Sequence, residues 1–203
     1  LGDSIFDNAR YVPDRPPVIE QVRRGLPPDW KATLVAVDGH TVEDIALQLP
    51  RVPSDATHLV VSVGGNDALM ASGLLHERAG TVGAALTVLA ESLGTFRATY
   101  AAMLKDVLAL GRLTSVCTIY DAIPILGDAE RAALAGFNDV ISRTAIGAGI
   151  PLVDLRVICN HPDDYSPLSP IEPSVVCGAK IADAIGRMLA GHDFAAARTA
   201  VWV

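Results

Sequence analysis

Short runs of apolar and β-branched residues recur along the chain and are separated by longer segments. Four such runs occupy residues 32–38, 57–63, 113–119 and 151–155. Nearly continuous apolar runs of this length are typical of strands buried on both faces, as in a parallel sheet that helices cover on each side. The alternation of these runs with helical segments therefore predicts an α/β protein.

Helical periodicity marks the segments between the runs. The longest helix is expected over residues 84–110, where apolar residues recur at alternating spacings of three and four. We interpret this stripe as the face that packs on the sheet, because large apolar side chains are mostly buried. Two further helices are expected, one from Asp128 to the glycines near residue 149 and one from Pro173 to Gly191. The stripe consists of Leu86, Leu89, Leu93, Phe96, Tyr100, Met103, Val107 and Leu110.

Charge and composition argue against two classes of partner. The 203 residues carry a formal net charge of -7. They contain no cluster of Lys or Arg, so nucleic-acid binding is not expected. No segment approaches the roughly 18 consecutive apolar residues of a membrane-spanning helix. A chain of this length fits one domain, which we expect to cover residues 1–203.

The cysteines suggest neither a disulfide framework nor a metal site. Cys117, Cys159 and Cys177 are few and scattered, and no Cys-x-x-Cys spacing occurs. We therefore expect a reducing, cytoplasmic environment. Because the chain begins at Leu1, directly before a motif that normally follows a strand, we also expect upstream residues. A cleaved export signal among them would change the expected location.

Polar motifs lie at the carboxyl ends of the predicted strands. The GDS motif at residues 2–4 would follow a first strand, Gly39 comes after the second, and the GGND motif at residues 64–67 comes after the third. Residues beyond the carboxyl ends of parallel strands converge on one crevice. A serine in a tight turn is accessible there, with backbone N–H groups and the Asn66 amide near the place where an oxyanion would form.

Together these motifs resemble the SGNH (GDSL) hydrolase family, with LGDSIFDN as the first block, Gly39 as the second and GGND as the third. The resemblance implies a three-layer α/β/α, flavodoxin-like fold with a five-stranded parallel sheet. It also implies hydrolysis of acyl esters by a serine nucleophile, here Ser4. In that family the oxyanion hole would correspond to the N–H of Ser4, Gly39 and Asn66.

The last block of the family departs from its usual pattern. Where the family has Asp-x-x-His, which supplies the base and its orienting aspartate, this chain has Ser169-Pro-Ile-Glu172. Glu172 is a candidate base if burial raises its pKa, although a helix starting at Pro173 would lower that pKa through its dipole. The alternative for Glu172 is a structural role as a helix cap.

A histidine elsewhere is the other candidate base. His161 lies in the long loop before Glu172, and His40 and His76 lie near the second and third blocks. If Glu172 is the base, we expect activity to persist at mildly acidic pH. If His161 is the base, activity should appear near the pKa of an imidazole, about 6 to 7.

The sequence thus predicts a serine hydrolase that acts on a small ester, either an acyl group on an alcohol or an acetyl group on a sugar. The alternative is a catalytically silent protein of the same fold that binds an acyl or carbohydrate ligand. A flavin or phosphate binder is disfavoured, because the first loop lacks a Gly-rich or Ser/Thr-rich cradle for phosphate. No cofactor is expected.

Overall fold

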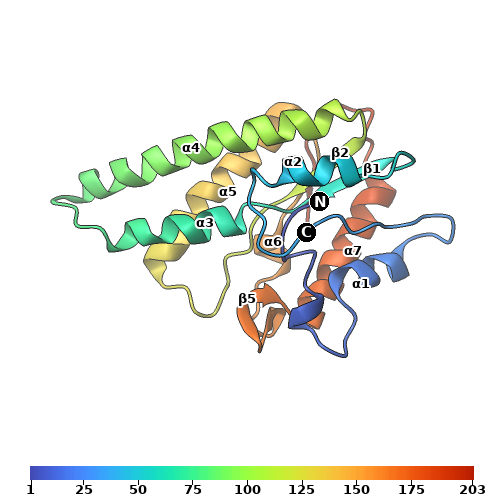
Figure 1. The fold of residues 1–203 in the computed structure, drawn as a ribbon, viewed down its shortest axis with the longest axis horizontal. Helices are drawn as coiled ribbons and strands as arrows, with labels where there is room; N and C mark the ends of the chain where they lie inside the picture. Colours follow the sequence, from blue (N-terminus) through green and yellow to red (C-terminus); the bar gives the residue numbers. More distant parts are fainter.

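The computed structural model describes all 203 residues and has an α/β fold with a four-stranded parallel sheet in the order β1-β2-β3-β6 (Figure 1). In register, Val61 of β1 pairs with Val116 of β2, which pairs with Leu152 of β3. Leu152 in turn pairs with Val201 of β6. The strands are β1 His58–Val61, β2 Leu113–Cys117, β3 Leu152–Val153 and β6 Val201–Trp202.

The expected five-stranded sheet is therefore corrected to four strands. Residues 32–38 form no strand, although Val37 N–H donates to Gly2 O at 3.1 Å and Gly2 forms an isolated parallel bridge with Ser62. The side chain of Gln48 also bonds to the backbone of Gly2. Its amide accepts from Gly2 N–H at 2.8 Å and donates to Gly2 O at 2.7 Å, so this N–H is not available to a neighbouring strand. Strand β6 is not predicted by the apolar pattern.

Helices cover both faces of the sheet (Figure 1). α4 and α5 pack together on one face and α1 and α7 on the other, each pair over its own hydrophobic core. A short antiparallel hairpin, β4–β5, lies outside the main sheet. The remaining elements are α1 Val18–Gly25, α2 Ile45–Gln48, α3 Gly65–Ala71, α4 Val82–Ala109, α5 Asp128–Ala148, α6 Leu155–Ile158, α7 Val175–Gly191, β4 Tyr165–Ser166, β5 Ser169–Pro173 and the 3-10 turns η1 Ala9–Tyr11, η2 Leu49–Arg51, η3 Ser72–His76 and η4 Pro162–Asp164.

The longest predicted helix is confirmed as α4, but only part of its apolar stripe is core. From Phe96 to Val107 the stripe is buried, whereas Leu86 is 60 % exposed. The reason is visible in Figure 1, where the first half of α4 projects beyond the sheet alongside α3 and the start of α5. None of the helices combines the length and the apolar character needed to cross a membrane.

The start of the last helix differs from the prediction. Pro173 ends β5, and α7 begins at Val175. Ser174 caps this helix, with its hydroxyl accepting hydrogen bonds from the N–H groups of Val176 at 3.1 Å and Cys177 at 3.3 Å. The cap role considered for Glu172 thus falls to Ser174.

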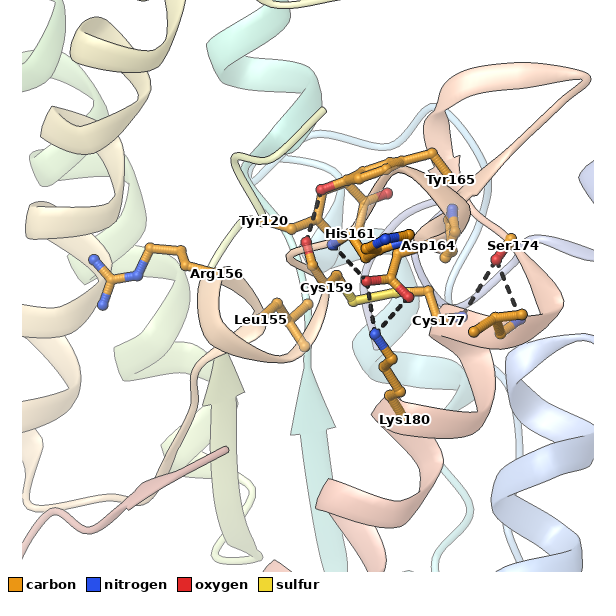
Figure 2. The surroundings of a disulfide bond; sticks show 12 residues. Tyr120, Leu155, Arg156, Cys159, His161, Asp164, Tyr165, Ser174, Cys177 and Lys180 are labelled. Carbon is orange, nitrogen blue, oxygen red and sulfur yellow. Dashed lines mark hydrogen bonds and ion pairs between the residues drawn. A yellow bond between two sulfur atoms is a disulfide. The ribbon is translucent and has the colours of Figure 1, made fainter. Parts of the chain in front are cut away.

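The expectation that the cysteines form no disulfide is wrong. Cys159, just after α6, is bonded to Cys177 in the first turn of α7, with the two Cα atoms 5.7 Å apart (Figure 2). Cys117 remains free and buried. Because structural disulfides are rare in reducing compartments, this bond argues against the reducing environment that was expected. Cytoplasmic location stays an untested prediction.

Candidate active site

A cavity of about 390 Å³ lies where the first block, the GGND block and β5 meet. Ser4, Asn66 and Glu172 all line it, together with Asp3 and Gly65. Three segments that are far apart in the sequence therefore contribute to one site. Gly39 and His161 do not line this cavity.

The first block reaches the cavity through a tight turn that requires glycine. Gly2 has a φ of 136°, and a Cβ atom on it would lie 1.9 Å from the carbonyl oxygen of Ser62. The next residue, Asp3, donates its N–H to that same oxygen at 3.1 Å. The chain then turns, with Phe6 and Asp7 N–H groups both bonded to Asp3 O, at 3.2 and 3.0 Å. This turn presents Ser4, which is 7 % exposed, at the wall of the cavity.

Two residues at the end of the first block, Asp7 and Asn8, form hydrogen bonds with segments far away in the chain. The carboxylate of Asp7 accepts a hydrogen bond from Asp38 N–H at 3.0 Å, next to Gly39. Asn8, fully buried, donates to Pro173 O at 3.1 Å and accepts from Val18 N–H at 2.9 Å. From the sequence, capping of the first helix was the favoured role for these two residues, and a place at the mouth of the pocket was the alternative. The bond from Val18 N–H, at the start of α1, to Asn8 agrees with the capping role.

The third block is linked to the second through side chains. Asn66 donates from Nδ2 to the carbonyl oxygen of His40 at 2.9 Å, and Asp67 accepts from Val42 N–H at 3.1 Å. An amide nitrogen carries two N–H donors, so Asn66 has one further donor available at the cavity. Gly39, with a φ of 85°, directly precedes the carbonyl group that Asn66 holds.

Glu172 lies inside β5 and is 5 % exposed. Burial raises its pKa to about 7, an effect that the nearby Ser4 side chain partly opposes and the Asp38 carboxylate reinforces. Of the two opposing effects considered from the sequence, burial prevails, because Glu172 belongs to a strand and not to the first turn of a helix. Its Oε2 atom has no hydrogen-bond partner in the protein, which leaves it free to accept a proton.

A second buried carboxyl group, Asp3, lines the same cavity. Its Oδ1 accepts from Ile5 N–H at 3.1 Å, whereas Oδ2 has no partner. Burial raises its pKa to about 7 despite the bond from Ile5, and the charges of Glu172 and Asp67 raise it further. Since like charges at one site disfavour double ionisation, Asp3 and Glu172 resist both being ionised at neutral pH.

None of the five histidines lines the cavity. The side chain of His161 is 64 % exposed and caps η4, with Nδ1 accepting from Asp163 N–H at 3.3 Å. His40 Nδ1 is hydrogen-bonded to the Gln48 amide at 3.0 Å, and His76 ends η3. The titratable groups that the fold places at the cavity with Ser4 are thus carboxyl groups, Glu172 and Asp3 among them, and not imidazoles.

The β4–β5 hairpin that carries Glu172 is fastened at several points. Tyr120 donates its hydroxyl to Ile171 O at 2.7 Å, one residue before Glu172. Figure 2 shows the base of this hairpin, where the disulfide lies beside the fully buried Asp164 and its ion pair with Lys180, at 2.7 Å. These contacts restrict the freedom of the segment that positions the carboxyl group.

The family follows from a comparison of the sequence with protein-family models. The model of the GDSL-like lipase/acylhydrolase family matches residues 1–172. The chain belongs to this family. A search of the curated proteins found no match.

Solved structures of similar fold include lipases and esterases. A lipase from a goat rumen metagenome has a TM-score of 0.72 at 17% identity, with 94% of each chain covered. An extracellular lipase from Streptomyces rimosus has a TM-score of 0.63 at 19% identity, covering 88% of this chain and 93% of its own. An acetylxylan esterase from Geobacillus stearothermophilus has a TM-score of 0.68 at 16% identity, covering 95% and 93%. At these identities the likeness shows a shared fold. The GDSL-like chain is a hydrolase that acts on esters.

Proposed function

We propose that Ser4 is the nucleophile of this ester hydrolase and that Glu172 is its general base. The observation that carries the proposal is the pairing of a buried carboxyl with Ser4 in a cavity that no histidine lines. A carboxyl group with a pKa of about 7 is a much stronger base than an ordinary glutamate and still ionises near neutral pH.

The first half of the reaction acylates the serine. Ionised Glu172 takes the proton from Ser4 Oγ as this oxygen bonds to the carbonyl carbon of the ester. The N–H of Ser4 and the second N–H of Asn66 Nδ2, both at the cavity, stabilise the resulting oxyanion. The third donor expected from the sequence, Gly39, does not line the cavity and is left out of this proposal. The carbonyl C–O bond to the alcohol then breaks, and the neutral Glu172 gives its proton to the leaving oxygen.

The second half releases the acid. Glu172, ionised again, takes a proton from a water molecule, whose oxygen bonds to the carbonyl carbon of the acyl-enzyme. The bond from that carbon to Ser4 Oγ then breaks, and Oγ recovers the proton from Glu172. The enzyme returns to its starting protonation state, and the products are the alcohol and the acid.

Two substitutions test the assigned roles. In Ser4→Ala and Glu172→Gln, kcat for a p-nitrophenyl ester should fall by about 10³-fold or more, because residues of one catalytic unit are each required. His161→Ala serves as the control and should keep most of its activity. Full turnover by Ser4→Ala would refute the nucleophile, and a large loss in His161→Ala with an active Glu172→Gln would assign the base to the histidine.

One observation favours the second candidate, a silent ligand-binding protein: Ser169 and Glu172 stand where the family's aspartate and histidine are found. The double substitution Ser169→Asp with Glu172→His separates the two. Under the proposed mechanism it lowers activity, because the cavity is arranged for a carboxyl base. A large gain from near zero would instead support the silent protein.

A further inference from the structure

The cavity at Ser4 extends far beyond the reacting groups, and 21 of its 30 lining residues are hydrophobic. We propose that this extension binds a straight acyl chain of about eight to twelve carbons, and that the substrate is an ester of such a medium-chain acid and not of acetic acid. The inference rests on the proposed function, because it places the carbonyl carbon of that chain at Ser4 Oγ.

The walls come from elements that the sheet does not need. α3 with η3, the first half of α4 and the first half of α5 supply most of the lining, and these are the parts that project beyond the sheet in Figure 1. Leu86 and Leu89, part of a stripe predicted to be core, line this cavity. The wall residues are Ala68, Leu69, Leu74, Leu75, Ala85, Leu86, Val88, Leu89, Ala129, Ala132, Ala133, Leu134 and Phe137.

The wall of the cavity is mainly apolar from the serine outward. Ile5, Ile119 and Ile171 line it with apolar side chains, and Asp3, Asn66 and Glu172 add polar groups. The hydroxyl of Tyr120, which also lines the cavity, is already bonded to Ile171 O. The charged lining residues on the outer elements are Glu77, Arg78 and Glu130, which lie on the η3–α4 connection and in the first turn of α5. A sugar ring would find few hydrogen-bond partners along this path.

The size of the cavity sets the length of the chain. At about 390 Å³ it lies within the range of small-molecule sites, roughly 300–1,000 Å³. A water molecule takes up about 30 Å³ in the liquid, and a methylene group is of similar size, so the space holds on the order of a dozen such groups. An acetyl group would leave most of the apolar surface in contact with water.

Chain-length selectivity follows from burial. Transfer of one methylene group from water into an apolar site changes an equilibrium by roughly fourfold. The value of kcat/KM for p-nitrophenyl esters should therefore rise by at least about tenfold from acetate to octanoate, and decline once the chain exceeds about twelve carbons. A preference for acetate over octanoate would overturn the proposal.

A matched pair of variants on α5 tests whether the acyl chain of the substrate binds in this cavity. Ala133 lines the cavity, whereas Ala135, on the same helix, is exposed and does not. Ala133→Phe should lower kcat/KM for octanoate and laurate by about tenfold or more while leaving acetate within about threefold, since only the long chains meet the new ring. Ala135→Phe should leave every ester unchanged. An equal loss for all chain lengths in Ala133→Phe, with its thermal midpoint unchanged, would contradict the assignment.

A binding measurement separates this inference from the proposed function. Calorimetric titration of Ser4→Ala with decanoate requires no catalysis. Saturable binding that Ala133→Phe weakens about tenfold and Ala135→Phe does not would support the acyl site even if no ester were hydrolysed. Absence of decanoate binding to folded Ser4→Ala, when the wild type hydrolyses p-nitrophenyl acetate and Ser4→Ala does not, would overturn the acyl site and leave the proposed function standing. If Ala133→Phe fails to fold, Ala85→Phe on α4 takes its place, with Ala84→Phe, which does not line the cavity, as its control.

Discussion

At the residue scale, a glutamate base and a histidine base differ in the charge that they carry after taking the proton of the serine. An imidazole becomes positive when it takes a proton, and the aspartate of a catalytic triad stabilises that charge. Glu172 becomes neutral in the same step, so a carboxylate three residues earlier would have no charge to stabilise. The serine at position 169 and the glutamate at position 172 are therefore consistent with one coordinated change.

The same carboxyl group determines how activity depends on pH. Because only the ionised form accepts a proton and burial raises the pKa of Glu172 to about 7, kcat/KM should rise with pH through about 7 and then level off. The expectation that a glutamate base would keep activity at mildly acidic pH is revised accordingly. The measurement is a profile of kcat/KM against pH.

Since an imidazole titrates in the same range, the profile is compared with that of His161→Ala. An unchanged curve assigns the inflection to the carboxyl pair of Glu172 and Asp3. A curve that loses its inflection would assign it to His161.

At the element scale, the β4–β5 hairpin determines where the base lies. It is held by the disulfide, by the buried Asp164 with Lys180, and by Asn8, which connects its end to the first block. The apolar patterns of the sequence correctly indicated β1, β2 and β3 and the helices α4 and α5, because those patterns are local. They gave no sign of the hairpin, the disulfide or β6, whose pairings join residues far apart in the chain.

Reduction of the disulfide should weaken both stability and catalysis. The two cysteines are 18 residues apart, and closing a loop of this size removes about 3 kcal/mol of unfolded-state entropy. The double variant Cys159→Ser with Cys177→Ser should lose about that much free energy of unfolding in urea titrations.

Activity of the double variant, assayed well below its unfolding midpoint, should also fall, because the hairpin with Glu172 gains freedom. The control is Cys117→Ser, which removes a cysteine but no bond. Full activity in a less stable double variant would show that the disulfide has no part in placing the base.

At the scale of the whole molecule, the two buried carboxyls make the fold less stable as pH rises. Asp3 has a pKa of about 7 in the folded chain and the ordinary value of 3.8 when unfolded. Its contribution to stability is complete below about pH 4 and is lost as pH increases through about 7, and Glu172 acts in the same direction.

Asp3→Asn should remove the share of this dependence that comes from Asp3, while keeping an acceptor for Ile5 N–H. Between about pH 5 and pH 8 the free energy of unfolding of the wild type should fall by on the order of 2 kcal/mol more than that of the variant. Urea unfolding at both values measures the difference. Parallel curves would mean that Asp3 ionises freely in the folded protein.

Some site residues could be predicted from the sequence and others could not, for physical reasons. The meeting of Ser4, Asn66 and Glu172 followed from placing their motifs at one edge of a parallel sheet. Asp3 was passed over, because its burial, and hence its raised pKa, depends on neighbours from other segments. The predicted strand at residues 32–38 was wrong, because an apolar run does not show whether distant backbone groups complete a ladder. Here the bond from Val37 N–H to Gly2 O forms without one.

The first half of α4 stands apart from the part of the helix that packs on the sheet. Residues there contribute little to the main hydrophobic core, so their replacement leaves the scaffold intact. Evolution, or an engineer, can therefore alter the range of accepted esters by changing this projecting segment while the machinery around the nucleophile stays as it is.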